Sequence, residues 1–182
     1  MRTDWTDAAG TLDVAPALQH LDLLADPVAE RVRQLADERI GVVAIDPELA
    51  DTADFCARYA SPPELSANCV VVAGKRSGEL RHASCTVLST TRTDVNGLVK
   101  RRLDVRKASF APMDDAVRLT GMERGGITPL GLPGEWPLLI DERVARGAAF
   151  VVGSGLRRSK LIVPGAVLAE LPGAEVRTDL GR

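Results

Sequence analysis

The chain has 182 residues, of which 45% are hydrophobic and 26% are charged, and this composition is sufficient for one folded domain with a sizeable core. Aromatic residues make up only 3% of the chain, so the core must consist mainly of Ala, Val, Leu and Ile. The formal net charge of −2 argues against a protein that coats nucleic acid non-specifically, because such binding depends on the neutralisation of phosphates by Lys and Arg.

Membrane, metal and cofactor functions find no support in the sequence. The apolar runs, such as Cys69 to Ala73, are too short to cross a bilayer, and the segment MRTDWTDAAG lacks the apolar stretch of a signal peptide. Cys56, Cys69 and Cys85 form no CxxC pair, and only two histidines could help them to hold a metal. We therefore expect a cytoplasmic protein with no membrane segment, no metal and no cofactor.

The first half of the chain is predicted to contain an arm, two helices and a strand. Residues 1–25 are expected to form an N-terminal arm with one short helix around Ala15 to Leu24, and residues 26–182 a single domain. Proline in the first turn and apolar residues at helical spacing predict helices from Asp26 to near Gly41 and from Pro47 to the Pro62-Pro63 pair. A short strand is predicted between these helices, over Val42 to Ile45.

From Asn68 onward the pattern changes to that of strands. The segment CVVVAG and a second run that ends in TVL flank a turn at Lys75 to Gly78, and together they predict a β-hairpin. Short strands and helices alternate in the rest of the chain. This mixture favours an α+β fold with a mixed sheet over a doubly wound one. The further predicted helices cover Asn96–Leu103, Met113–Leu119 and Pro164–Leu171.

The segment LTGMERGGITPLG, residues 119–131, is the most informative motif. Gly125 and Gly126 allow the backbone to approach a ligand without interference from a Cβ atom, and Pro129 then fixes the chain direction. Such a loop presents N–H and C=O groups that can recognise a ribose hydroxyl or an ester carbonyl, and its donors can stabilise the transition state of an acyl transfer. Spacing alone favours an ordinary tight turn. No GK[ST] follows, so the loop is not a P-loop.

The ordered strings NCVVVAG, LTGMERGGITPLG, LLIDERV, VVGSGLRRSKL and PGAVLAEL resemble the YbaK/prolyl-tRNA synthetase editing-domain family over roughly Val42 to Leu171. The most specific part is the GxxxP loop from Gly125 to Pro129. The resemblance implies an α+β fold with a mixed, strongly curved, barrel-like sheet flanked by short helices. It also implies an aminoacyl-tRNA deacylase that hydrolyses the ester of a mischarged tRNA.

The substrate implied by the resemblance carries a small amino acid such as Ala, Ser or Cys, with tRNA-Pro as one candidate tRNA. The partner would be the acceptor end of tRNA with its aminoacyl-adenosine, and a synthetase could act with the protein in trans. The resemblance assigns catalytic positions to Asn68, Gly125, Gly126 and Asp141. Substrate-binding positions are assigned to Ile127, Thr128, Pro129, Ser154 and Gly155.

Asn68 departs from the family pattern, which has a lysine at the start of this hairpin strand. A neutral amide donates a hydrogen bond about half as strong as that of a charged ammonium group. The alternative function is therefore a non-catalytic module that binds tRNA or aminoacyl-adenosine and has lost hydrolysis with the lysine. Lys75 lies beyond the strand, in the predicted turn, and is not expected to replace it.

Two basic clusters are candidates for contact with the acceptor stem, although charge runs are more often solvated faces. The candidate residues are Lys100, Arg101 and Arg102 in the first cluster and Arg157, Arg158 and Lys160 in the second. A nucleophilic pair of Cys85 and His82 is disfavoured, because residues three apart on a strand point to opposite faces. Asp114 and Asp115 are expected to be surface acids at a helix start.

Overall fold

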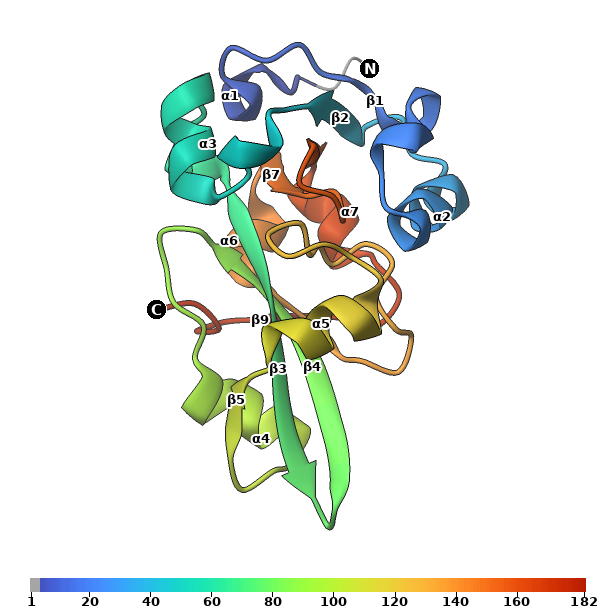
Figure 1. The fold of residues 1–182 in the computed structure, drawn as a ribbon. Helices are drawn as coiled ribbons and strands as arrows, with labels where there is room; N and C mark the ends of the chain where they lie inside the picture. The colour runs from blue at the N-terminus through green and yellow to red at the C-terminus, as the bar shows by residue number, and fades with distance from the viewer. Residues whose placement is uncertain (1–3) are drawn as a thin grey trace.

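The structure, a computed structural model, describes residues 4–182 and contains two β-sheets (Figure 1). One sheet has four strands in the order β1-β2-β8-β7, and the other has five in the order β5-β3-β4-β6-β9. The strands are β1 (Ala15–Pro16), β2 (Gly41–Ala44), β3 (Ala67–Arg76), β4 (Glu79–Leu88), β5 (Ala108–Phe110), β6 (Leu138–Asp141), β7 (Phe150–Gly153), β8 (Ser159–Val163) and β9 (Ala174–Arg177).

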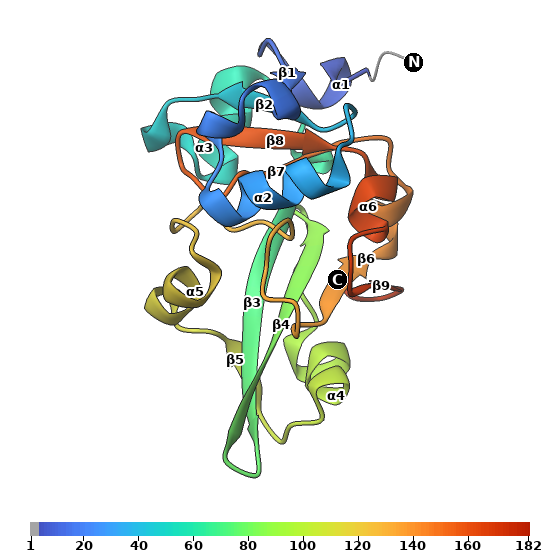
Figure 2. The same ribbon diagram turned by 90° about the vertical axis from the view of Figure 1, so that its right-hand side faces the viewer.

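Short helices surround the two sheets (Figure 2). The α-helices are α1 (Thr6–Ala9), α2 (Asp26–Leu35), α3 (Thr52–Tyr59), α4 (Lys100–Leu103), α5 (Met113–Thr120), α6 (Glu142–Arg146) and α7 (Gly165–Ala169). Short 3-10 helices are η1 (Ala17–Gln19), η2 (Leu21–Leu23), η3 (Pro47–Leu49) and η4 (Pro63–Leu65). The element η5 (Val95–Val99) is a π-helical turn. None of the helices in residues 4–182 is long and apolar enough to span a membrane.

The predicted hairpin is confirmed as the β3–β4 pair. Its antiparallel register runs from Ala67 opposite Leu88 to Arg76 opposite Glu79, and the hairpin projects away from the four-stranded sheet (Figure 1). At its other end, Ser66 forms an isolated bridge with Val151 of β7. The start of β3 therefore lies where the two sheets meet, whereas the turn of the hairpin lies far from that junction.

The two sheets do not close into a barrel, which corrects the barrel-like sheet expected from the resemblance. The ladders of β2, β8 and β7 lie within their own sheet, while β6 pairs in parallel with both β4 and β9. Among the described residues the Ser66–Val151 bridge is the only β pairing between the sheets. One such bridge is too little to continue a hydrogen-bonded ladder from one sheet into the next, so the α+β architecture consists of two open sheets.

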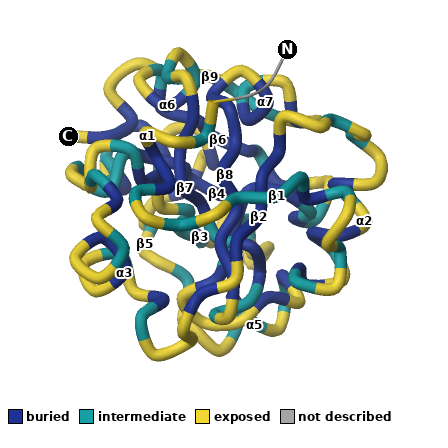
Figure 3. Tube along the Cα trace, turned by 90° about the horizontal axis from the view of Figure 1, so that it is seen from above, coloured by how far each residue is buried: buried dark blue, intermediate teal, exposed yellow. Residues whose placement is uncertain are grey.

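The core is built from aliphatic side chains, as the composition predicts. Val28 and Val32 of α2 pack with Ile40, Leu161 and other buried residues between the helix and the four-stranded sheet. Viewed from above, the strands are mostly buried and the outer helical turns are exposed (Figure 3). The molecule thus buries its sheets through Val, Leu, Ile and Ala packing, with few aromatic anchors.

The N-terminal segment packs against the four-stranded sheet. β1 pairs with β2, Ala8 and Ala17 are buried, and the Trp5 indole N–H donates to the carbonyl of Arg39 at 2.8 Å. The single helix expected around residues 15–24 is replaced by β1 and the turns η1 and η2. Pairing of Pro16 with Gly41 holds this stretch extended, which prevents a continuous helix.

Candidate functional site

A cavity of about 250 Å³ lies at the junction of the two sheets, and we call it the junction cavity. Its walls come from the η3–α3 segment, the start of β3, the glycine-rich loop and the facing ends of β7 and β8. These segments are far apart in the sequence, so the cavity exists only in the folded chain. Its lining includes Ala50, Asp51, Thr52, Phe55, Ser66, Ala67, Asn68, Cys69, Val70, Met113, Gly125, Ile127, Val151, Val152, Gly153 and Lys160.

The glycine-rich loop forms one wall because its glycines allow close backbone contact. Gly125 has a φ of +77°, a left-handed conformation that favours glycine. Gly126 accepts a hydrogen bond from the N–H of Gly155 at 2.7 Å, and a Cβ atom on Gly126 would lie 2.9 Å from the backbone of Gly155 and Leu156. The N–H of Glu123 also donates to the Gly155 carbonyl, at 2.8 Å. The loop is thus fixed against the β7–β8 turn.

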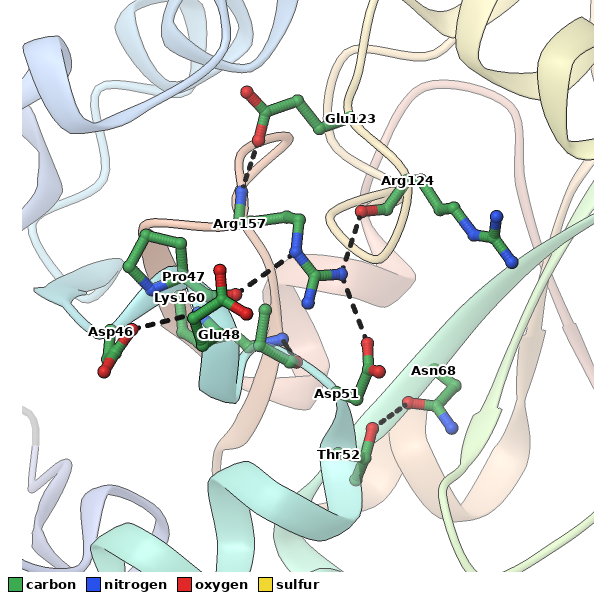
Figure 4. Close-up of polar contacts among 11 residues, drawn as sticks. Asp46, Pro47, Glu48, Asp51, Thr52, Asn68, Glu123, Arg124, Arg157 and Lys160 are labelled. Carbon is green, nitrogen blue, oxygen red and sulfur yellow. Dashed lines mark hydrogen bonds and ion pairs between the residues drawn. The ribbon is translucent and has the colours of Figure 1, made fainter.

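Arg157 holds the glycine-rich loop to the segment that precedes α3 (Figure 4). Its guanidinium group donates to the carbonyls of Pro47 and Arg124 at 3.2 and 3.3 Å and to the carboxylate of Asp51 at 3.2 Å. The backbone N–H of Arg157 donates to the Glu123 carboxylate at 2.7 Å. The sequence suggested tRNA contact for Arg157, but these bonds occupy its guanidinium group within the protein. Its role is to position two walls of the junction cavity.

Replacement of Arg157 by methionine is expected to lower activity at this site about 10-fold, because a displaced wall misplaces the substrate. The matched control is Arg158→Met, since the exposed Arg158 side chain donates instead to the Asp22 carbonyl at 2.6 Å, away from the loop. Turnover by both variants can be compared with that of the unaltered protein. Equal rates for the two variants would contradict a positioning role for Arg157.

Asn68 lies at the mouth of the junction cavity. Its side chain is exposed, and its Oδ1 accepts a hydrogen bond from the hydroxyl of Thr52 at 3.0 Å (Figure 4). Thr52 is the first residue of α3, so this bond connects the start of β3 to the helix. The bond leaves the Nδ2 group as a neutral donor at the cavity edge.

Lys160 is buried in the junction cavity, which corrects the expectation that it lies on a surface in contact with tRNA. The residue is only 7% exposed, and its Nζ donates to the carbonyl of Ala50 at 2.7 Å. The ammonium also lies 5.6 Å from the ring centroid of Phe55. The apolar run LIV that follows Lys160 in the sequence was the available signal, because a strand buried on both faces also buries the residues beside it.

Burial lowers the pKa of Lys160 to about 8, since desolvation disfavours the charged form. The positive charge of Arg157 lowers this pKa further, whereas Asp51 and Cys56 raise it. The cavity therefore holds an amine that is mostly protonated at neutral pH and that loses its charge just above it.

Thiol nucleophiles are not activated around the junction cavity. Burial raises the pKa of Cys69 to about 12, and it also raises the pKa of the fully buried Cys85. His82, which the sequence offered as a partner for Cys85, stacks instead on Trp136 with ring centroids 5.0 Å apart. A protonated thiol is a poor nucleophile, so these cysteines are small apolar residues at neutral pH.

Several residues assigned by resemblance support the junction cavity from outside it. The Ser154 hydroxyl lies within the β7–β8 turn, 3.0 Å from the carbonyl oxygens of both Leu156 and Ser159, to either of which its single O–H can donate. Gly155 has a φ of +85° in the same turn. Thr128 is buried, and Pro129 lines a separate small hollow. The structure thus brings Asn68, Gly125, Ile127 and Lys160 to the cavity walls and places Gly126 directly behind them.

Asp141 lies outside the junction cavity, at the start of α6. Its carboxylate accepts from the backbone N–H of Arg143 at 2.9 Å, from the guanidinium group of Arg143, and from the N–H of Gly181 at 2.8 Å. Burial raises the pKa of Asp141, but these hydrogen bonds outweigh it and leave the pKa below its ordinary value. Asp141 therefore caps α6 and fixes the C-terminal segment.

The first basic cluster lies on and beside α4, near the hairpin. Arg102 forms an ion pair with Glu175, with its Nε 2.8 Å from one carboxylate oxygen. Arg101 is exposed and Lys100 is half-buried, and no ion pair involves either of them within residues 4–182. These two residues keep the free charge that binding of a phosphate backbone requires.

Comparisons with known proteins agree with this architecture. A family model described as the aminoacyl-tRNA editing domain matches residues 46–171. The structure of hypothetical protein APE2540 has a TM-score of 0.74 and 19% sequence identity, and the match covers 86% of this chain and 100% of that chain. A structure described as a candidate trans-editing enzyme for prolyl-tRNA synthetase has a TM-score of 0.72 and 19% identity, over 87% of this chain and 96% of its own. A comparison with curated proteins finds no match.

Proposed function

The chain belongs to the aminoacyl-tRNA editing domain family, and from this premise we propose that it hydrolyses the ester bond between a small amino acid and a tRNA to which that amino acid was wrongly attached. The single observation that carries the proposal is the junction cavity. It lies within the family region, and the glycine-rich loop forms one of its walls. This family is the one that the sequence motifs resemble.

The size of the junction cavity suits a single aminoacyl group and not a larger ligand. Its volume of about 250 Å³ is below the roughly 300–1,000 Å³ that is common for sites of drug-sized ligands. Phe55, Val151 and Ile127 contribute apolar surface to its walls. An alanyl, seryl or cysteinyl group fits within this volume.

A second hollow supports binding of the terminal nucleoside beside the amino acid. This hollow, of about 530 Å³, shares Asn68 and Val70 with the junction cavity and also includes Arg92, Asn96 and Phe110. The Phe110 side chain is 57% exposed, an unusual placement for phenylalanine. Exposed aromatic rings offer a face on which a nucleobase can stack. The adenosine of the acceptor end would therefore occupy this hollow while its aminoacyl group enters the junction cavity.

A Phe110→Ala variant is expected to raise KM for aminoacyl-tRNA about 10-fold with little change in kcat, because stacking of one base contributes roughly 1–3 kcal/mol. Leu80→Ala is the matched control, since Leu80 is 51% exposed at the hairpin turn and lies in neither cavity. Initial rates over a range of substrate concentration measure both constants. A KM that remains at the unaltered value would remove Phe110 from the nucleoside site.

The tRNA beyond its terminal nucleoside would contact the exposed basic surface. Lys100 and Arg101 on α4, with the nearby Arg106 and Lys107, have positions that allow ionic contact with phosphates. Such contacts weaken as salt concentration rises, because counterions compete for the phosphates. Lys160 does not belong to this surface because its side chain is buried, and the partly exposed guanidinium group of Arg157 is bound to Asp51.

The proposed reaction is a direct attack by water on the ester carbonyl. The thiol of Cys69, which lines the cavity, is protonated, so catalysis would depend on positioning of the ester and on donors aimed at the carbonyl oxygen. The experiment that tests this function follows ester loss from tRNAs charged with Ala, Ser, Cys or Pro after addition of the purified protein. We expect turnover of at least one small aminoacyl ester; no turnover of any of the four would overturn the proposal.

A further inference from the structure

Lys160 occupies an unusual environment for a lysine. Ser159, Leu161 and Ile162 of the same strand are buried, and the backbone carbonyl of Ala50 accepts the hydrogen bond that the lysine Nζ donates in the structure. The nearest acid, Asp51, is already paired with Arg157 at 3.2 Å. An ammonium group has three N–H donors, so up to two remain for a group inside the junction cavity.

A purely structural role explains this placement poorly. Burial of a cation without a carboxylate partner is costly, and an apolar side chain of similar length would pack beside Phe55 and Ile162 without that cost. Lys160 lies beside the segment that carries Asp51 and Thr52, on the wall of the cavity that Asn68 borders (Figure 4). The charge is therefore placed where a ligand with a partial negative charge would be bound.

We propose that Lys160 is a catalytic residue whose ammonium group binds the carbonyl oxygen of the substrate ester and stabilises the negative charge that forms on it. This inference rests on the proposed deacylase function. Water attacks the carbonyl carbon, and the π electrons of the C=O bond move to the oxygen next to Lys160. The intermediate then re-forms the C=O bond and releases the ribose oxygen, which receives a proton that originates from the water. The products are the free amino acid and the tRNA hydroxyl, and Lys160 is unchanged.

The pH dependence follows from the charges around the amine. Arg157 from the β7–β8 turn, Asp51 from the segment before α3 and Cys56 of α3 are the charged or titratable groups that act on it. Because the protonated amine is the active form, its contribution is complete well below a pKa of about 8 and is lost as the pH rises above it. A neutral amine acting as a base would produce the opposite trend.

The test compares Lys160→Met with the unaltered protein on a charged tRNA that the latter deacylates. We expect kcat/KM to fall about 100-fold at pH 6.5, with an unchanged or higher melting temperature. The difference in kcat/KM between the two proteins should shrink steadily between pH 7 and pH 9.5, because the ammonium group of the unaltered protein loses its proton. A merely structural lysine would not produce this convergence.

A second variant keeps the proposal testable if methionine impairs folding. Lys160→Arg retains a positive charge that does not titrate in this range, so it should keep part of the activity and lose the decline above pH 8. Full activity of Lys160→Met would overturn the role of Lys160, and so would a Lys160→Arg variant whose activity still declines above pH 8. Either result would leave the deacylase function standing. An unaltered protein that hydrolyses none of the charged tRNAs would overturn both.

Discussion

A Gly126→Val variant is expected to lose deacylation activity by about 100-fold or more, because it separates the glycine-rich loop from the β7–β8 turn. A Cβ atom at this position would lie 2.9 Å from the carbonyl carbon of Gly155 and from the nitrogen of Leu156. Both atoms belong to a backbone that cannot move without breaking the 2.7 Å hydrogen bond between Gly155 and Gly126. The loop would be pushed away, and the junction cavity would lose a wall.

The control for Gly126→Val is Gly134→Val, because a Cβ atom on Gly134 meets no atom within 4 Å. Both variants add the same side chain. A difference between their rates therefore arises from the contact of the new side chain at position 126 and not from the conformational preference of valine. Initial rates of ester hydrolysis and melting temperatures should be measured for both. A Gly126→Val protein with the rate of the unaltered protein would show that the docked loop is not required for function.

Replacement of Asp141 by alanine is expected to lower the free energy of unfolding by about 2–4 kcal/mol without removing any group from the junction cavity. The buried carboxylate accepts hydrogen bonds from Arg143 and from the N–H of Gly181, and all of these are lost. Asp115→Ala is the control, since its ion pair with Arg118 is exposed and should contribute less than about 1 kcal/mol. Urea unfolding of both variants measures the difference.

The contribution of Asp141 should also depend on pH in a defined direction. Hydrogen bonds hold its pKa in the folded state below the ordinary value of 3.8. Its contribution is therefore complete above that value and is lost as the pH falls through the lower pKa of the folded state. The difference in the free energy of unfolding between the unaltered protein and Asp141→Ala should be constant from pH 5 to 7 and should decrease below about pH 4. A gap that widens on acidification would contradict this assignment.

Local signals in the sequence predict many of the elements correctly. Alternation and turn residues gave the β3–β4 hairpin, and Pro112 with Gly121 marked the ends of the helix found at Met113–Thr120. Asp94 accepts from the N–H groups of Gly97 and Leu98, as expected for a residue that begins a helical segment. These features depend on neighbours within a few residues, so the sequence contains the information that defines them.

Contacts between distant residues could not be predicted in the same way. Arg157 and Lys160 both contact residues more than 100 positions earlier in the chain, so a basic run in the sequence gave no sign of these partners. The pairing of strands into two open sheets is likewise non-local, and the family resemblance led to the incorrect barrel-like form. The loop at Gly125 and Gly126 was identified because its motif is continuous in sequence.

The role of a cation in the junction cavity depends on such a distant contact. The pattern implied by the resemblance has a lysine where this chain has Asn68, and that substitution supported the alternative function, a module that only binds. The structure brings Lys160 of β8 to the same cavity. An ammonium group is thus present although it comes from another strand, which supports catalysis over simple binding.

Hydrolysis of an aminoacyl ester in the junction cavity is tested by incubating alanyl-tRNA with the purified protein at pH 7 and following loss of the ester. Binding of the same tRNA is measured in parallel on the same preparation. We predict repeated turnover, with more ester cleaved than protein present, and about a 100-fold lower rate for Gly126→Val. Firm binding of tRNA with ester loss no faster than in buffer, for alanyl-tRNA and for the seryl and cysteinyl forms, would contradict the account and identify a binding module.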